Sequence, residues 1–197
     1  MSNLTASLSV AAHHLCDLAK YGLEGVAHLK ADAAADHAAL LAANRAFDAA
    51  TSTSDIAKAA AAQLVAGHNA ESTQRHAQFA ESLLAASIDA ACGALLQLAK
   101  QALSQRHGNP KSWPAGRQVG SLSLTQIILQ ARNQSQHYEE GRYRNDVESA
   151  FNVLRSEHGP QFDLTVTPRR SHARDVIQLL GWLDPKAVVA DLDPLLS

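Results

Sequence analysis

The chain has 197 residues, of which 46% are hydrophobic and 18% charged, and its formal net charge is -2. This composition excludes an intrinsically disordered chain, which would hold fewer apolar and more charged residues. The near-neutral charge also excludes a general electrostatic attraction of the whole molecule to nucleic acid. The length suffices for one domain with its own core, and we predict a single helical domain over residues 1–197.

Alanine is abundant before residue 103 and favours closely packed helices. We therefore predict an all-α fold, a helical bundle with long antiparallel helices. Leucines spaced three and four residues apart predict a helix over residues 3–20. Because Gly22 and Gly25 loosen this pattern before a second helix at about 29–50, residues 1–50 are expected to form a helical hairpin.

The segment TSTSD at residues 51–55 predicts a break and a new helix start, followed by a long helical region over residues 55–106. A kink or a short break is expected at residues 67–69. Residues 84–102 carry apolar side chains in four-three alternation, which is typical of antiparallel helix packing. Residues 107–122 then form a loop containing two prolines and three glycines, either functional or mobile. Trp113 in this loop either anchors it to the bundle or stacks on a base.

Residues 123–181 are expected to hold a helix rich in chemically capable side chains and the C-terminal helices. Over residues 123–141, Ser123 is a suitable N-cap and Gly141 a suitable C-terminal stop. One face of this helix is predicted to be buried, and it carries Leu124, Ile127, Ile128, Ala131, Ser135 and Tyr138. The opposite face carries Gln126, Gln130, Asn133 and His137, with Arg132 on the flank between them.

Beyond this helix, Asn145 or Asp146 can cap a helix that ends at Gly159. Alternating apolar residues then predict at most one short extended segment, near 162–166. Ser171 can cap the last substantial helix, and Pro185 suits the first position of a short terminal one.

The sequence RNQSQH at residues 132–137 resembles the R-x-x-x-x-H signature of the HEPN family, including the asparagine after the arginine. This resemblance implies an all-α bundle that dimerises through the motif helix, and a metal-independent endoribonuclease of the toxin or phage-defence type. It implicates Arg132, Asn133 and His137 as catalytic residues. Some toxins of the family carry a tyrosine two residues after the histidine, where this chain has Glu139, so any role of that tyrosine does not transfer.

The residue types suit this chemistry. Histidine can take or give a proton near neutral pH, while arginine can bind a phosphate and stabilise developing charge. Asn133, one turn before His137, can hydrogen-bond the imidazole. We expect Arg142, Arg144 and Gln136 to bind the RNA, since the guanidinium fork fits phosphate. In the alternative interpretation His137 and these arginines lie on a solvated face, and the chain is a non-catalytic module that binds RNA, a nucleotide or a protein.

No metal or cofactor is expected, because the ten histidines form neither a Glu-x-x-His nor a His-Glu-x-x-His pattern. Cys16 and Cys92 are far apart and predict free thiols in a reducing compartment. The first 20 residues lack the basic region of a signal peptide. We therefore expect a soluble cytoplasmic protein with RNA, a second copy of itself and an antitoxin or regulatory protein as partners, and no membrane.

Overall fold

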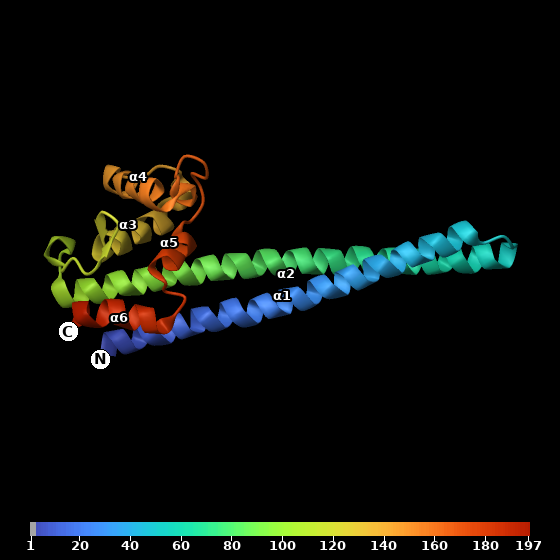
Figure 1. The fold of residues 1–197 in the computed structure, drawn as a ribbon, viewed down its shortest axis with the longest axis horizontal. Helices are drawn as coiled ribbons and strands as arrows, with labels where there is room; N and C mark the ends of the chain where they lie inside the picture. Colours follow the sequence, from blue (N-terminus) through green and yellow to red (C-terminus); the bar gives the residue numbers. More distant parts are fainter. Residues whose placement is uncertain (1–2) are drawn as a thin grey trace. The chain divides into compact units, whose positions relative to one another are not determined.

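The computed structural model describes residues 3–197 and confirms the all-α fold (Figure 1). The helices are α1 (Asn3–Ala49), α2 (Thr53–His107), α3 (Leu124–His137), α4 (Asn145–His158), α5 (Ala173–Leu180) and α6 (Pro185–Leu196). Strands β1 (Gln118–Val119) and β2 (Leu122–Ser123) form a small antiparallel sheet in which Gln118 pairs with Ser123. Three short 3-10 helices are η1 (Pro110–Ser112), η2 (Tyr138–Glu140) and η3 (Pro160–Phe162).

The helical hairpin predicted within residues 1–50 is wrong, because α1 is one unbroken helix through Gly22 and Gly25. Helix α2 also runs through Gly67 without a break. A glycine inside a helix costs only about 1 kcal/mol relative to alanine, and the surrounding alanines are strong helix formers. At Gly22 the missing side chain has a packing role, since a Cβ there would collide with the side chain of Leu84.

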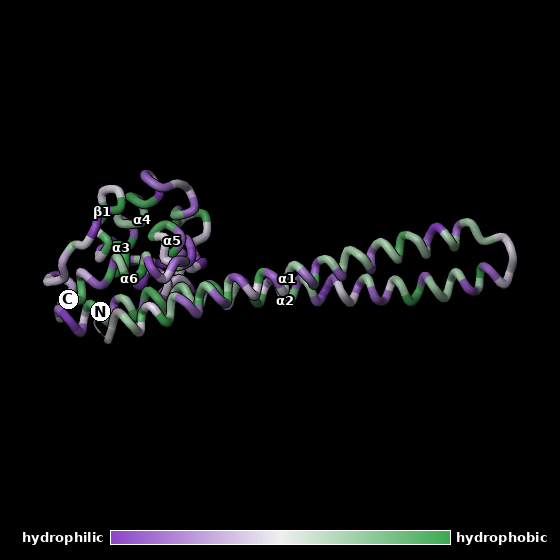
Figure 2. The backbone as a smooth tube through the Cα atoms, turned by 60° about the horizontal axis from the view of Figure 1, so that its bottom comes forward, coloured by the Kyte–Doolittle hydropathy of each residue, from purple (hydrophilic) through white to green (hydrophobic). Residues whose placement is uncertain are grey.

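The described chain forms two compact units, one of residues 3–18 and Ser87–Ser197 and the other of Ala19–Ala86. The Ala19–Ala86 unit is an antiparallel pair of helical segments from α1 and α2, joined through residues 50–52. Its buried side chains are small, namely Ala33, Ala70 and Ala77. Figure 2 shows hydrophobic and hydrophilic residues interspersed along both segments. Large apolar side chains such as Phe79 and Leu64 remain exposed.

Helix α2 contains one window that is long and apolar enough to cross a membrane by length and composition, and a third of that window is buried in the structure. A core helix of a water-soluble protein meets the same criterion. The composition of α2 therefore assigns no location to the protein.

The other unit contains the larger side chains of the core. Its fully buried residues include Trp182, Phe151, Phe162, Leu95, Leu96, Leu103, Leu124, Ile127, Ile128 and Leu154. The rings of Phe151 and Phe162 lie 6.4 Å apart, and that of Phe151 lies 5.7 Å from His172 in an edge-on arrangement. Burial of such side chains stabilises each by about 1.5–3 kcal/mol, and this core fixes α3 between α4 and α5.

The loop at residues 107–122 is ordered and holds η1 and the small sheet. Trp113 is buried, and its indole nitrogen donates a hydrogen bond of 3.2 Å to the Gly108 carbonyl, as the anchoring interpretation predicts. Arg117 of the same loop donates to both carboxylate oxygens of Asp191 on α6, at 2.7 and 2.9 Å. The Arg117 contact therefore fastens the loop to α6.

The extended segment predicted near 162–166 is wrong, because η3 ends at Phe162 and turns follow it. Asp163 accepts a hydrogen bond of 2.8 Å from the Thr165 backbone, which closes a local turn of the kind that aspartate favours. Phe162 is buried whereas Val166 is 73% exposed. The apolar alternation therefore did not reflect one buried strand face.

Candidate functional site

Helix α3 carries the motif residues in its last turns; it begins as predicted but ends at His137 rather than at Gly141. Ser123 is the N-cap and forms a capping box with Gln126. Gly141 ends the following η2 with a φ of 64°, a conformation that glycine adopts without strain. Leu124, Ile127, Ile128, Ala131 and Ser135 are buried as predicted, while Tyr138 is half-buried. The buried face fixes which way the motif side chains point.

The N-cap residues of α4 and α5 differ from the predicted ones. Arg144, rather than Asn145 or Asp146, occupies the N-cap position of α4. His172 occupies that of α5, although the Ser171 hydroxyl accepts a hydrogen bond from the Ala173 backbone at 3.3 Å. Pro185 lies in the first turn of α6 as predicted.

Arg132 is half-buried, and neighbouring side chains hold its guanidinium. Its Nε donates to Oε1 of Gln97 on α2 at 2.5 Å, and its Nη1 donates to Oδ1 of Asn133 at 3.2 Å. For Nη2 the structure records no hydrogen bond within residues 3–197. One end of the guanidinium is therefore fixed while the other can receive an anion.

His137 lies at the end of α3 with its side chain 56% exposed. Its Nδ1 lies 2.8 Å from Oε1 of Glu140, three residues along in η2. The hydrogen bond expected from Asn133 to the imidazole is replaced by this one, since the Asn133 oxygen accepts from Arg132 instead. A carboxylate at Nδ1 favours the tautomer that leaves Nε2 able to accept a proton.

The three residues expected to bind RNA are all exposed. Gln136 is on α3, and Arg142 and Arg144 lie in the segment before α4. The Arg144 side chain is 84% exposed and lies 3.6 Å from Asp146. Within residues 3–197 no hydrogen bond or ion pair joins these three to Arg132, Asn133 or His137.

Gln134 organises this region, and the sequence reasoning missed it. Its side chain is fully buried. The amide oxygen accepts from the His172 backbone at 2.9 Å, and the amide nitrogen donates to the Arg170 carbonyl at 2.7 Å and to the Tyr143 hydroxyl at 3.1 Å. The available signal was its position between Ala131 and Ser135 on the buried side of the helix.

The Tyr143 hydroxyl takes part in two hydrogen bonds. It accepts one from Gln134 and donates the other to the Pro168 carbonyl at 2.7 Å. Burial raises the pKa of this phenol, and the hydrogen bond from Gln134 opposes that change. Gln134 and Tyr143 together tie the segments on either side of α4 to the motif helix. Tyr143 also lines a neighbouring pocket.

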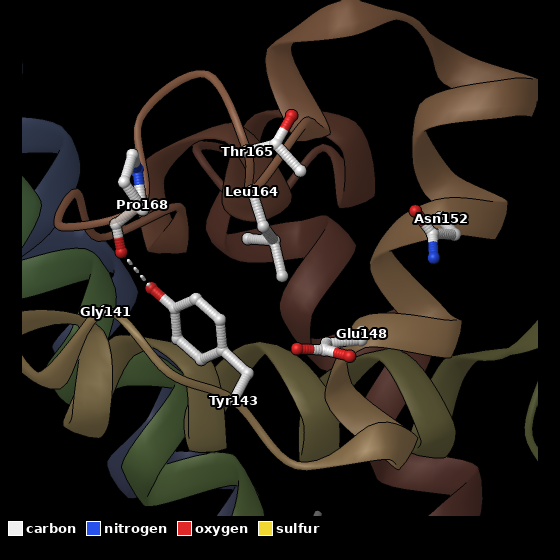
Figure 3. Close-up of a pocket in the computed structure, with 7 residues that line it drawn as sticks. All are labelled: Gly141, Tyr143, Glu148, Asn152, Leu164, Thr165 and Pro168. Carbon is white, nitrogen blue, oxygen red and sulfur yellow. Dashed lines mark hydrogen bonds between the residues drawn. The ribbon is translucent and has the colours of Figure 1, made fainter.

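This pocket has a volume of about 380 Å³ and is lined by Gly141, Tyr143, Glu148, Asn152, Leu164, Thr165 and Pro168 (Figure 3). The side chains of Glu148 and Asn152 project from α4 toward the pocket, while Tyr143 and Leu164 stand on its other sides. The pocket begins at Gly141, four residues after His137. A ligand bound here would therefore approach the segment that follows the motif.

Among residues 3–197, no group of three or more histidine, cysteine, aspartate or glutamate side chains could hold a metal ion. Cys16 and Cys92 are free thiols. Comparison with known proteins adds no family assignment: no family model matches the chain, and no curated protein or solved structure matches it.

Proposed function

We propose that the chain is a HEPN-like metal-independent endoribonuclease whose site contains Arg132, Asn133 and His137. The observation that carries the proposal is the orientation of the Arg132 and His137 side chains in the last turns of α3. The imidazole is exposed and oriented by Glu140, and the guanidinium is oriented by Gln97 and Asn133 with its Nη2 unbound among the described residues. Orientation of an acid-base group and of an anion-binding group is what phosphodiester cleavage requires.

RNA supplies the nucleophile in this reaction. His137 removes the proton from a 2′-hydroxyl, whose oxygen attacks the adjacent phosphorus as the bond from phosphorus to the 5′-oxygen breaks. Protonation of that 5′-oxygen completes the cleavage. The products are a 2′,3′-cyclic phosphate and a 5′-hydroxyl. Arg132 stabilises the negative charge that accumulates on the phosphoryl oxygens, and Asn133 holds the guanidinium in place.

A second copy of the chain completes the site. Five residues on an α-helix correspond to about 140° of rotation, so Arg132 and His137 of one protomer diverge from a common point. An isologous contact across a two-fold axis brings each polar edge against its own mate. One imidazole can then act as the base and the other as the acid. We accordingly propose a homodimer formed through α3.

The family resemblance extends this proposal to a cytoplasmic toxin or phage-defence nuclease that is controlled by an antitoxin or a regulatory protein. Gln136, Arg142 and Arg144 would contact the RNA backbone outside the cleavage site. Their exposure leaves the side chains available for phosphate, and the contacts would weaken with salt as phosphate contacts do.

One observation favours a second candidate function, a non-catalytic RNA-binding or protein-binding module. The Nε of Arg132 already donates to Gln97 within the chain, so part of the guanidinium serves the fold. In that case the polar edge of α3 binds a ligand without cleaving it.

The two candidates are separated by incubating the purified protein with a labelled RNA in the presence of EDTA. The nuclease proposal predicts cleavage that survives chelation and leaves 2′,3′-cyclic phosphate and 5′-hydroxyl ends. Fragments with 3′-hydroxyl and 5′-phosphate ends, or intact RNA that remains bound to the protein, would reject it.

A further inference from the structure

We infer that the pocket at Gly141 and Tyr143 binds a guanine base of the RNA beside the cleaved phosphate. This inference rests on the proposed ribonuclease function for the identity of its ligand. The pocket volume of about 380 Å³ lies within the usual range of small-ligand sites, about 300–1,000 Å³.

The walls of the pocket can hold a flat, partly apolar ring. Tyr143 stands on one side, and its hydroxyl donates to the Pro168 carbonyl (Figure 3). The same hydroxyl accepts a hydrogen bond from Gln134. Leu164 projects toward the pocket from the segment after α4. Aromatic and aliphatic surfaces are the usual support for unstacked RNA bases. Because Tyr143 is already immobilised, little side-chain entropy would be lost on binding.

The polar side of the pocket comes from α4. Glu148 and Asn152 lie one helical turn apart and project toward the same space. Both side chains are exposed, and the structure records no hydrogen bond or ion pair for either within residues 3–197. A carboxylate and an amide are therefore free to bind a ligand rather than occupied by the fold.

This pair of groups selects guanine by hydrogen-bond chemistry. A carboxylate offers only acceptors, and it can take two parallel N–H bonds at once. Guanine presents adjacent donors at N1 and N2 on its Watson–Crick edge. Adenine and cytosine place an acceptor beside their amino group, and uracil flanks its single N–H with two acceptors. The Asn152 amide can donate to O6 of the guanine that Glu148 binds.

Arginine side chains near the pocket indicate where the phosphates of the bound nucleotide would lie. Gly141 lines the pocket, and the Arg169 side chain packs against it, 3.4 Å from where a Cβ would lie. Arg142 and Arg144 flank Tyr143 in sequence and are exposed. A base held by Glu148 would therefore have its phosphates near arginines, which suit that charge.

Binding of free nucleotides tests the pocket without requiring cleavage. We would measure the dissociation constants of the 3′-monophosphates of guanosine, adenosine, cytidine and uridine for the full-length protein. The expected result is tightest binding of the guanosine nucleotide, with at least a tenfold weakening in Glu148→Gln. Glu24→Gln, the same change at an exposed glutamate in the other unit, should leave binding unchanged. Since Glu148 is exposed, its substitution should not prevent folding.

The outcomes separate this inference from the proposed function. Guanosine nucleotide binding that depends on Glu148 supports the pocket even if RNA is never cut, in which case only the nuclease proposal fails. Equal affinity for all four nucleotides, no binding of any, or binding that Glu148→Gln leaves unchanged would overturn the guanine site while leaving the nuclease proposal to its own test.

Discussion

The Nδ1 atom of His137 lies 2.8 Å from Oε1 of Glu140, and the imidazole remains more than half exposed. Glu140 lies three residues after His137, where α3 passes into η2, and side chains at this spacing lie on the same side of a helix. A carboxylate at Nδ1 orients the ring and leaves Nε2 for the proton of the RNA.

This relationship predicts graded effects of two substitutions on RNA cleavage. His137→Ala should lower the single-turnover cleavage rate by about 10²–10⁴, the usual contribution of a general acid or base. Glu140→Ala should lower it less, because it removes only the group that orients the ring. Glu139→Ala, which alters an exposed neighbour with no recorded contact to His137, is the matched control. Equal rates for the Glu140 and Glu139 variants would show that the carboxylate has no role.

Substitution of Gln134 should destabilise the protein, whereas substitution of Gln136 on the same helix should not. Gln134→Leu leaves the His172 backbone, the Arg170 carbonyl and one side of the Tyr143 hydroxyl without a partner. Unsatisfied buried groups cost about 1–3 kcal/mol each, so the free energy of unfolding should fall by about 3 kcal/mol. Gln136→Leu, at an exposed position of the same helix, should change it by less than about 0.5 kcal/mol. Urea unfolding curves measure both, and similar losses would contradict this account.

The contribution of Glu157 to the stability of the protein should depend on pH. Hydrogen bonds from the Ser121 hydroxyl and backbone hold its pKa below the ordinary value of 4.5. The contribution is therefore present above pH 4.5 and is lost as the pH falls through the lower native pKa. Glu157→Gln should be less stable than the wild type at neutral pH, and the difference should shrink on acidification. The control Glu24→Gln should show no such trend, and a difference that grows in acid would contradict the prediction.

The two thiols should differ in reactivity. Burial raises the pKa of the Cys92 thiol to about 12, and burial together with Asp184 and Asp17 also raises that of Cys16. Since the thiolate is the reactive form, alkylation of the native protein near pH 8 should be slow at both. Cys16, which is only half-buried, should react first. Mass spectrometry of the alkylated protein measures this order, and rapid modification of Cys92 would show that its surroundings open in solution.

The sequence predicted the features that depend on local patterns. Ser123 caps the motif helix as expected, and Leu124, Ile127, Ile128 and Ala131 are buried, although α3 ends at His137 and Gly141 ends only the following η2. These follow from cap chemistry and helical periodicity, which need no knowledge of distant residues. Trp113 is likewise buried, as large aromatic side chains in ordered loops usually are.

What the sequence could not predict depends on tertiary partners. Gly22 looked like a helix break, but Leu84, far along the chain, packs into the space that it leaves. Arg132 is held by Gln97, 35 residues away, and Gln134 by His172, 38 residues away.

Cleavage of RNA by mixed variants tests the central claim most directly. Arg132→Ala and His137→Ala would be assayed singly, as a double substitution, and after unfolding and refolding in equal amounts together, between about pH 6 and 8, where histidine titrates. The account predicts metal-independent cleavage by the wild type, almost none by each variant alone, and partial recovery in the mixture, because a mixed dimer regains one arginine and one histidine across its interface. Wild-type protein that leaves RNA intact throughout this range, or a double variant that cuts as fast as the wild type, would contradict it.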